Sequence, residues 1–252
     1  QTTTWATGSP LSNGKHVYAY FGSHGLYCFT MDGEPVWGKD LGNLSIAREF
    51  GEGSSPSLYK DRIIVNWDHE GQSFIVALNA ATGDEIWRKD RDEDTTWMTP
   101  LVVEDSGRTH VITTGQNKVR AYDFITGDIL WEDEGLTANA IPSPIARDGI
   151  VYLMSGFRGA ALRAVKLSEA DGTITGTSAV LWEYNQNTSY VPSALLHGDV
   201  LYFLRSNNGV VTSLDINTGK PYYSNQRIEG LSTVYASPVG VVDRVYLPGR
   251  NG

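Results

Sequence analysis

The residues that could bind a ligand or exchange a proton centre on one short run of the chain. Trp67, Asp68, His69 and Glu70 place an indole, a carboxylate, an imidazole and a second carboxylate side by side. Such groups can donate and accept hydrogen bonds, and an imidazole titrates near neutral pH. Polar residues recur at the position of Glu70 when the repeats described below are aligned. The candidate ligand-binding residues are therefore His24, Trp67, Asp68, His69, Glu70, Arg158 and Asn208, with Lys118 at the same repeat position.

An unspecialised turn is the alternative interpretation of the same residues. A glycine follows the polar position in four repeats, at Gly25, Gly71, Gly159 and Gly209. A tight turn needs only a polar residue and a glycine that can adopt a positive φ. This explains the glycines well, but it explains less well why the polar residues differ so much in chemistry. Both interpretations stay open.

The sequence offers little support for a catalytic or metal centre. The pair Asp68-His69 is weak evidence for acid–base catalysis, because neighbouring side chains at a strand end usually point apart. No G-x-S-x-G, H-E-x-x-H, C-x-x-C or P-loop motif is present. Asp90, Asp92 and Asp94 alternate as in a calcium loop, but the glycine and the distal glutamate of an EF-hand are missing. We therefore expect no catalytic residue and no metal ligand among these motifs.

The elements that must position these residues recur along the chain, as a repeat architecture requires. In the clearest unit, Ser55-Pro56 opens a strand, apolar runs follow at Ile63–Val65 and Phe74–Leu78, and a turn at Thr82-Gly83 precedes a strand ending at Trp87. Four antiparallel strands in a repeat of about 40–50 residues are typical of β-propeller blades. The corresponding proline landmarks are Pro10, Pro56, Pro100, Pro144, Pro192 and Pro238.

The sequence thus predicts an all-β fold, a single β-propeller domain over residues 1–252 made of four-stranded antiparallel blades. We expect Gln1–Thr4 to form an extended lead-in and Ser168–Ala179 to protrude as a hairpin or loop within the fourth blade. Five complete blades and half of a sixth do not close a ring. A C-terminal continuation, giving a seven- or eight-bladed propeller, or another chain is expected to complete it. The blades are predicted at about 5–37, 54–87, 97–131, 139–182, 190–223 and, in part, 235–252.

Two groups of aromatic residues recur in register. Those that end the fourth strand are predicted to pack between blades, and those that precede the proline landmarks lie nearer the candidate face. The second group can underlie a flat ligand or sugar ring, or simply cover the ends of the inner strands. The first group is Trp37, Trp87, Trp131 and Trp182, and the second is Trp97, Tyr190 and Tyr235, with Trp5 a little further off.

Composition narrows the class of protein. With 40% hydrophobic and 19% charged residues, the chain is globular rather than disordered. A net charge of −9 argues against a nucleic-acid groove, which needs a basic footprint. The sequence contains no run of about 18 apolar residues, so we expect no transmembrane segment. The single cysteine, Cys28, is expected to be a small core residue.

The stretches Thr82–Trp87 and Thr126–Trp131 resemble the TGxxLW repeat of the pyrroloquinoline-quinone-like (PQQ-like) β-propeller family. The resemblance covers almost the whole chain. The family includes quinoprotein dehydrogenases, the BamB-like propeller of the outer-membrane barrel-assembly machine, and secreted bacterial propellers of unknown role. This chain is most similar to the last group. The resemblance implies a periplasmic or secreted protein that binds a protein partner or a small polar or anionic ligand.

The dehydrogenases of this family typically hold PQQ between a tryptophan and a disulfide of adjacent cysteines, with a calcium ion and an aspartate base. Cys28 is alone, so that disulfide cannot form, and we expect neither PQQ nor calcium. Three hypotheses remain. The first is a non-catalytic binding scaffold in the cell envelope or outside the cell. The second is an enzyme that acts on a carbohydrate or small polar substrate through His24, His69, Glu70 and Arg158. The third is a quinone-dependent dehydrogenase whose cofactor residues lie outside this segment.

Overall fold

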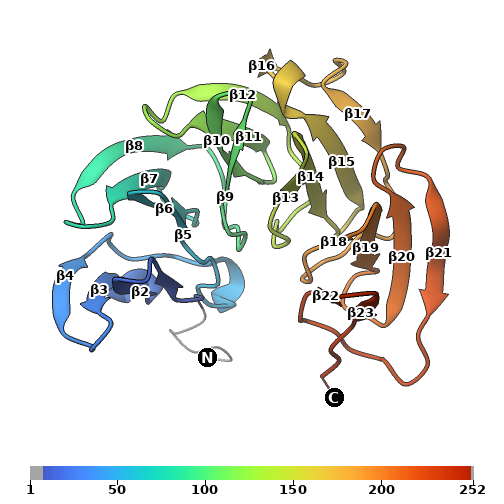
Figure 1. The fold of residues 1–252 in the computed structure, drawn as a ribbon, viewed down its shortest axis with the longest axis horizontal. Helices are drawn as coiled ribbons and strands as arrows, with labels where there is room; N and C mark the ends of the chain where they lie inside the picture. Colours follow the sequence, from blue (N-terminus) through green and yellow to red (C-terminus); the bar gives the residue numbers. More distant parts are fainter. Residues whose placement is uncertain (1–7, 251–252) are drawn as a thin grey trace.

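The computed structural model describes residues 8–250 of the chain. The predicted lead-in Gln1–Thr4 and the predicted position of Trp5 lie outside these residues. Strands dominate the described part, and they group into six antiparallel sheets that follow one another along an arc (Figure 1). In the five sheets that have four or more strands, Figure 1 shows the first strand on the concave side and the fourth strand on the rim. Each sheet is one blade, so the predicted all-β propeller is confirmed.

The first three blades match the predicted repeat closely, because each proline landmark and each Gly turn falls between strands. Their strands are β1 (Leu11–Ser12), β2 (His16–Tyr20), β3 (Leu26–Thr30) and β4 (Pro35–Lys39) in blade 1, β5 (Ser57–Tyr59), β6 (Arg62–Trp67), β7 (Ser73–Asn79) and β8 (Glu85–Arg91) in blade 2, and β9 (Leu101–Asp105), β10 (Arg108–Thr113), β11 (Lys118–Asp123) and β12 (Ile129–Glu134) in blade 3.

Blades 4 and 5 are also four-stranded, and the sixth sheet has two strands within the described residues, as predicted. Blades 1 and 6 stand at the two ends of the arc in Figure 1. What completes the ring stays a prediction. The strands are β13 (Ile145–Arg147), β14 (Ile150–Ser155), β15 (Ala161–Lys166) and β17 (Val180–Glu183) in blade 4, β18 (Leu195–His197), β19 (Val200–Leu204), β20 (Val210–Asp215) and β21 (Pro221–Arg227) in blade 5, and β22 (Val239–Val241) and β23 (Arg244–Tyr246) in blade 6.

The insertion Ser168–Ala179 lies between the third and fourth strands of blade 4, as predicted, but it does not simply protrude. It begins in the short helix η3 (Leu167–Glu169) and continues into β16 (Gly172–Thr173), which pairs in parallel with β12 of blade 3. Hydrogen bonds hold it there, because Thr175 donates its hydroxyl to Asp133 at 2.6 Å and accepts the amide of Glu134 at 3.0 Å. The insertion therefore makes blade 3 a five-stranded sheet.

The landmark Pro192 is two residues out of register. The amide of Ser143 donates to the hydroxyl of Ser193 at 3.0 Å, and the amide of Ser193 donates to Ser237 at the same distance. Ser143 and Ser237 each precede a proline landmark, so Ala194, which follows Ser193, holds the position of that proline in blade 5. The proline landmark was assigned wrongly in blade 5 because Pro192 stands two residues before this position.

The hydrophobic core lies between blades rather than within them. One cluster joins Tyr18 and Leu26 of blade 1 to Ile63 and Val76 of blade 2, and corresponding clusters fill the next three interfaces. A single blade exposes both faces, so each is stabilised only by its neighbours. Cys28 is fully buried in the first of these interfaces, as expected.

The recurring tryptophans hold adjacent blades together, which confirms their predicted packing role. Each indole N–H donates to a carbonyl in the turn of the following blade: Trp37 to Ala80 at 3.2 Å, Trp87 to Phe124 at 3.0 Å and Trp182 to Ile216 at 3.0 Å. The glycine of the Thr-Gly pair in that turn has a positive φ, and a Cβ there would lie within 2.6–2.7 Å of the indole ring. The Thr-Gly and the tryptophan of the repeat are thus two halves of one contact between blades. The glycines are Gly83, Gly127 and Gly219.

Trp131 is the exception in this series. Its ring is fully buried among residues of blades 3 and 4, but its Nε1 has no hydrogen-bond partner within the described residues. The following blade is the one that carries the insertion, and η3 replaces the regular turn there. The interface between blades 3 and 4 therefore keeps the packing but not the hydrogen bond.

None of the helices in the described part of the chain is both long enough and apolar enough to cross a bilayer.

Candidate functional site

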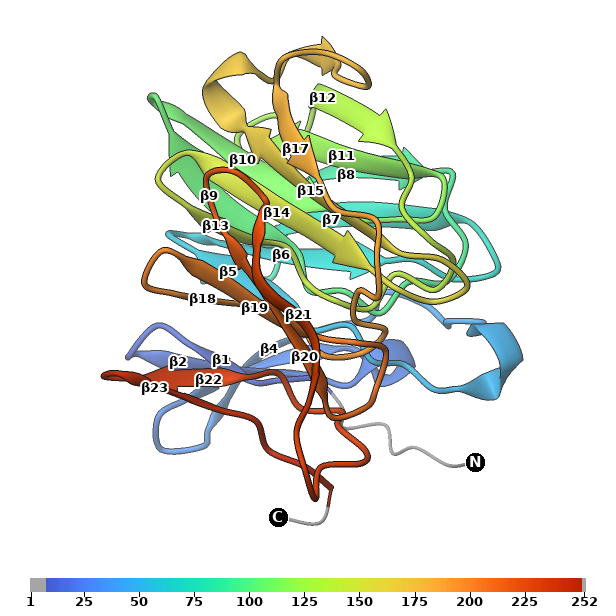
Figure 2. The ribbon, with the colours of Figure 1, turned by 90° about the vertical axis from the view of Figure 1, so that its right-hand side faces the viewer.

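One face of the propeller gathers the candidate residues. Because strands alternate in direction, the turn between the second and third strands and the connection to the next blade lie at the same end of each blade. We call this end the turn face; it lies to the right in Figure 2, where η2 (Ala47–Glu49) projects. Backbone hydrogen bonds join the two kinds of loop, as between Glu70 N and Ser45 O at 2.8 Å and between Leu136 N and Gly115 O at 3.0 Å.

Three glutamates tie these loops together. Glu52 accepts the amide of Ser23 at 2.7 Å and its hydroxyl at 2.5 Å. Glu93 accepts the amides of Asn117 at 3.0 Å and Lys118 at 2.7 Å. Charged acceptors make such bonds stronger than neutral ones. Glu52 and Glu93 are buried, and burial raises the pKa of Glu93, although the two amides that it accepts oppose the shift. These carboxylates fix the shape of the turn face.

The candidate Glu70 belongs to the same set. Its Oε1 accepts the hydroxyl of Thr95 at 2.6 Å and the amide of Thr95 at 3.2 Å. Thr95 lies in the connection from blade 2 to blade 3, and its hydroxyl also accepts the amide of Ala47 at 3.0 Å. Glu70 is exposed, but one of its oxygens is committed to holding two connections in place.

Asp68 lies below the turn in a buried ion pair. Its two oxygens accept Nε and Nη2 of Arg91 at 2.7 and 3.0 Å, and both side chains are fully buried. Asn66 and Thr96 donate to the same carboxylate, at 2.8 and 2.7 Å. Arg91 donates in turn to Tyr122 of blade 3 at 2.8 Å. Both oxygens of Asp68 therefore accept hydrogen bonds inside the protein, between blades 2 and 3. The carboxylate presents no surface to a ligand.

Trp67 is also a core residue. It is 2% exposed, so no ligand on the turn face can reach it. Its ring stacks on Phe74 at a centroid distance of 5.6 Å and meets the edge of Tyr20 at 6.4 Å. The reason is that β6 continues through Trp67, whose side chain points into the interface with blade 1. The sequence run from Trp67 to Glu70 therefore crosses from the core to the surface within four residues.

His69 is half-buried in the turn itself. Its Nδ1 accepts the amide of Ser45 at 3.1 Å, and its Nε2 lies 3.2 Å from the carbonyl of Gln72. This pattern assigns the neutral tautomer with the proton on Nε2. The ring also covers Gly71, where a Cβ would approach it within 2.6 Å. Both ring nitrogens of His69 thus form contacts that hold the turn.

His24, Arg158 and Asn208 occupy the corresponding turns of blades 1, 4 and 5, which Figure 1 shows well separated along the arc. His24 and Arg158 are exposed, and Asn208 is half-buried with its Oδ1 unpaired within the described residues. Arg158 adopts a positive φ of 53°, which costs a non-glycine residue energy. The structure thus places all seven candidates at the turn-face end of their blades, but only the consecutive residues Trp67, Asp68, His69 and Glu70 lie together, and the first two are buried.

Aromatic residues also lie on this face. The Phe157 ring stacks on Tyr190 at 4.6 Å, and the Arg158 guanidinium lies 5.3 Å from the Phe157 centroid. Tyr235, in the connection before blade 6, is 56% exposed. Sequence reasoning named Tyr190 and Tyr235 but missed Phe157, whose signal was its place in the same turn as Arg158.

Sequence reasoning also missed Phe50, an exposed residue that follows two residues with unusual backbone angles. Arg48 and Glu49 have positive φ values of 53° and 54°, and Phe50 follows them. Phe50 is 44% exposed and packs at 6.4 Å against Trp97, whose Nε1 donates to Gly51 at 2.9 Å. Strained backbone persists only where the surroundings hold it, and it concentrates at functional sites.

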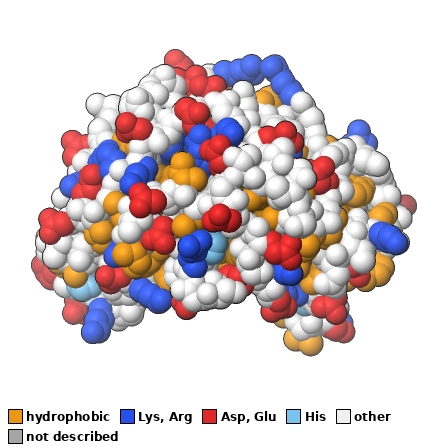
Figure 3. All heavy atoms as spheres, turned by 90° about the horizontal axis from the view of Figure 1, so that it is seen from above, with side chains coloured by type: hydrophobic (Ala, Val, Ile, Leu, Met, Phe, Trp, Pro, Cys, Tyr) orange, Lys and Arg blue, Asp and Glu red, His pale blue; other side chains and the backbone are white. Residues whose placement is uncertain are grey.

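The outer rim has a different character. Figure 3 shows acidic and basic side chains interspersed over it rather than gathered by sign. Several are paired across strands and blades: Arg163 meets Asp133 at 2.9 Å and Glu183 at 2.8 Å, and Arg120 meets Asp92 at 2.6 Å. Arg163, Asp133 and Arg120 are buried, so these pairs join strands and blades and point to no ligand.

The described residues do not fit the quinone site of the dehydrogenases. Cys28 is buried and is the only cysteine of the chain. In the part of the chain that the structure describes, no three His, Cys, Asp or Glu side chains are grouped so that they could hold a metal ion. We therefore derive no step through PQQ or calcium for this segment.

Comparison with known proteins places the fold. A family model described as outer membrane protein assembly factor BamB matches residues 1–134 and 71–252, which together span the chain. The chain is similar to the crystal structure of BamB from Moraxella catarrhalis, with a TM-score of 0.66 and 17% identity over 90% of this chain and 65% of that one. No curated protein matches the sequence.

Enzymes with the same fold are similar as well. A europium-containing methanol dehydrogenase gives a TM-score of 0.60 at 15% identity over 88% of this chain and 52% of its own. A quinohemoprotein alcohol dehydrogenase from Pseudomonas putida HK5 gives 0.57 at 16% identity over 90% of this chain and 43% of its own. At these identities the likeness shows the fold alone. The chain spans less than two thirds of the length of each of these three structures.

Proposed function

The chain belongs to the PQQ-like propeller family whose model is described as outer membrane protein assembly factor BamB, and on this premise we propose that it is a non-catalytic scaffold that binds a protein partner through its turn face. We place it in the periplasm or outside the cell, in keeping with the name of that family. It acts by presenting a fixed surface rather than by chemistry on a substrate.

One observation carries this proposal: the carboxylates of the turn face bind its own loops, while the aromatic residues Phe50 and Tyr235 stay exposed. Glu52, Glu70 and Glu93 each join a turn to a connection, and Asp68 is buried with Arg91. Loops held in this way lose little entropy when a partner binds, which favours affinity. The same commitment leaves little free acid–base capacity for catalysis.

The accessible residues suit a protein interface. Phe50 and Tyr235 are 44% and 56% exposed on the turn face, and Tyr190 stacks on Phe157 beside Arg158. Tyrosine, tryptophan and arginine dominate the energetically important positions of protein interfaces. Aromatic rings contribute large contact areas while their polar tips stay hydrated. A partner protein would therefore meet exposed aromatic side chains on the turn face, and Arg158 beside the Phe157–Tyr190 stack.

Photo-cross-linking in cells tests this proposal. A photoreactive phenylalanine analogue at position 50 or 235 should cross-link to one and the same envelope protein. Position 125 is the control, because Ile125 is 61% exposed in a turn at the opposite end of blade 3. With the captured protein purified, Tyr235→Ala should weaken binding about tenfold or more, as loss of an interface anchor does. Ile125→Ala should leave the dissociation constant within about twofold.

Cross-links to the captured protein from position 125 as strong as those from 50 and 235 would contradict this use of the turn face. So would a dissociation constant that Tyr235→Ala leaves unchanged.

A small anionic or polyhydroxyl ligand is the second candidate, and Arg158 is the observation that favours it. Its guanidinium is exposed beside the Phe157–Tyr190 stack, so it can offer two parallel donors next to an aromatic surface. A thermal-shift screen of sugar acids should then find ligands whose affinity Arg158→Ala abolishes. Arg108→Ala, at the opposite end of blade 3, is the matched control. A ligand that both variants bind equally well would remove Arg158 from the site.

A further inference from the structure

Hydroxyl groups link the inner strands from blade to blade. The amide of Ser9 donates to the hydroxyl of Ser55 at 2.9 Å, and the amide of Thr99 donates to Ser143 at 3.0 Å. The bonds from Ser143 to Ser193 and from Ser193 to Ser237 continue the series. We call this series the hydroxyl ladder. It joins blades 1 and 2, and then blades 3 to 6.

The hydroxyl ladder is interrupted between blades 2 and 3. Among the described residues, no hydrogen bond joins the amide of Ser55 to the hydroxyl of Thr99. β5 begins two residues after Ser55, and β9 begins two residues after Thr99. The bond is therefore missing although the two residues hold equivalent positions. Two other hydroxyl groups of β5 bond across this seam: Ser57 donates to the carbonyl of Pro100, and Tyr59 donates to Glu104 at 2.9 Å.

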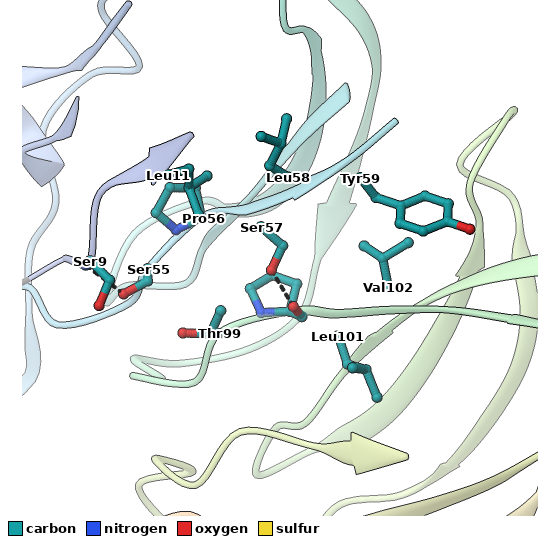
Figure 4. Close-up of a pocket in the computed structure, with 11 residues that line it drawn as sticks. Ser9, Leu11, Ser55, Pro56, Ser57, Leu58, Tyr59, Thr99, Leu101 and Val102 are labelled. Atoms are coloured by element: carbon teal, nitrogen blue, oxygen red, sulfur yellow. Dashed lines mark hydrogen bonds between the residues drawn. The ribbon is translucent and has the colours of Figure 1, made fainter. Parts of the chain in front are cut away.

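A pocket opens at the interruption. It has a volume of about 380 Å³ and is bordered by the inner strands of blades 1, 2 and 3, which Figure 4 shows converging on it. Ser55 and Thr99, the two residues whose mutual bond is missing, both line it. Its apolar wall includes Leu11, Leu58 and Val102. Pro56 and Pro100 also border it, and neither has an amide hydrogen to offer.

The lining restricts what can bind. None of the described residues that border the pocket is Asp, Glu, Lys, Arg or His. A charged ligand would lose its hydration without gaining a counter-charge, which is costly. An apolar ligand gains from contact with the leucines and the valine, and the hydroxyl of Thr99 can donate one hydrogen bond to it. The volume lies in the range of small-molecule sites.

We propose that this inner-strand pocket binds an uncharged, mainly apolar small molecule that carries a carbonyl or hydroxyl group, which replaces the missing rung of the hydroxyl ladder. This site is separate from the turn face and does not depend on the scaffold role. It lies between inner strands, so a ligand there contacts three blades at once.

The neutral dye Nile red is a suitable probe, because it is apolar, carries one carbonyl and fluoresces more strongly in apolar surroundings. We expect saturable binding of one dye to each chain, with a blue-shifted emission. The anionic dye 8-anilinonaphthalene-1-sulfonate should bind at least about tenfold more weakly, because no cation lines the pocket. Equal affinity for the two dyes, or no saturable binding of Nile red, would overturn the proposal.

Two substitutions at Thr99 locate the dye. Thr99→Val keeps the shape and removes the hydroxyl, so we expect affinity for Nile red to fall about three- to tenfold, as loss of one hydrogen bond predicts. Thr99→Phe fills the pocket and should abolish binding. Ser193→Ala is the control, because it removes the hydroxyl that accepts the amide of Ser143, in an intact rung between blades 4 and 5 that includes no residue lining the pocket. It should lower thermal stability but leave dye affinity within about twofold.

If Thr99→Phe fails to fold, as far-UV circular dichroism would show, Thr99→Val still decides. Unchanged affinity in Thr99→Val, or an equal loss in Ser193→Ala, would contradict the assignment of this pocket.

Discussion

Replacing the blade tryptophans by phenylalanine separates their packing from their hydrogen bonding. Trp87 and Trp131 occupy the same position in consecutive blades and are both buried, at 7% and 0% exposure. Trp87 donates to Phe124 O at 3.0 Å, whereas Nε1 of Trp131 has no partner within the described residues. The same change of side chain therefore removes a hydrogen bond at one site and an unsatisfied donor at the other.

The expected difference follows from these contacts. Truncation to alanine should cost about 3–5 kcal/mol at either position, because it leaves a cavity of the same size. In Trp87→Phe the lost hydrogen bond adds about 1 kcal/mol to the cavity cost. The acceptor stays satisfied, because Arg62 also donates to Phe124 O, at 2.7 Å. In Trp131→Phe the buried unpaired donor disappears, which returns at least about 1 kcal/mol. Trp87→Phe should thus be less stable than Trp131→Phe by about 2 kcal/mol.

Equilibrium unfolding in urea, followed by circular dichroism, measures this difference, provided that both variants keep the wild-type dependence on urea. Gly127→Ala is a companion variant, because its Cβ would lie 2.7 Å from the Trp87 ring at a φ of 74°. It should be destabilised in the wild-type background and less so beside Trp87→Phe. Equal losses for Trp87→Phe and Trp131→Phe would refute the role given to the indole N–H.

Three further predictions concern other side chains. Burial lowers the pKa of His110 from its ordinary 6.5, so this imidazole binds a proton at a higher pH in the unfolded chain than in the folded chain. The free energy of unfolding should therefore fall below pH 6.5, by at most about 1.4 kcal/mol per pH unit, and His110→Gln should remove this part of the slope in urea titrations. Thr175→Ala should cost about 1–2 kcal/mol and speed amide exchange in the insertion, whereas Ser178→Ala, which loses only an exposed contact to Glu169, should do neither. Asp68→Ala should cost about 3–5 kcal/mol, because it leaves Arg91 buried and unpaired; a melting temperature near that of the wild type would contradict this.

The fold could be predicted because its signals are local. In blade 2, alternation of apolar residues and the Gly turns place the strands at Ile63–Trp67 and Ser73–Leu78, and the structure has β6 at Arg62–Trp67 and β7 at Ser73–Asn79. Period-2 alternation and turn chemistry need no distant partner to be read. The pairing of β16 with β12 was not predictable in this way, because it depends on how blades 3 and 4 approach each other.

The candidate site was predicted less well, for a related reason. The residue types at positions 68, 69 and 70 are those of a ligand site, but their partners are distant in sequence. Asp68 meets Arg91, His69 meets Ser45, and Glu70 meets Thr95. A sequence shows that a side chain is polar, but not whether water or a neighbouring loop will satisfy it. The repeat position did predict that these residues lie at one end of their blades.

Amide hydrogen exchange on the free protein tests the central claim most directly, namely that the polar groups of the turn face hold it in shape. Ser23, Thr95, Asn117 and Lys118 donate their amides to Glu52, Glu70 and Glu93. The account predicts that these loop amides are protected about tenfold or more over an unstructured peptide, as a net hydrogen bond of about 1–2 kcal/mol requires, and that Glu93→Ala removes the protection at Asn117 and Lys118. Exchange of all four amides at the rate of an unstructured peptide would contradict the account. It would mean that the carboxylates are free to meet a polar ligand.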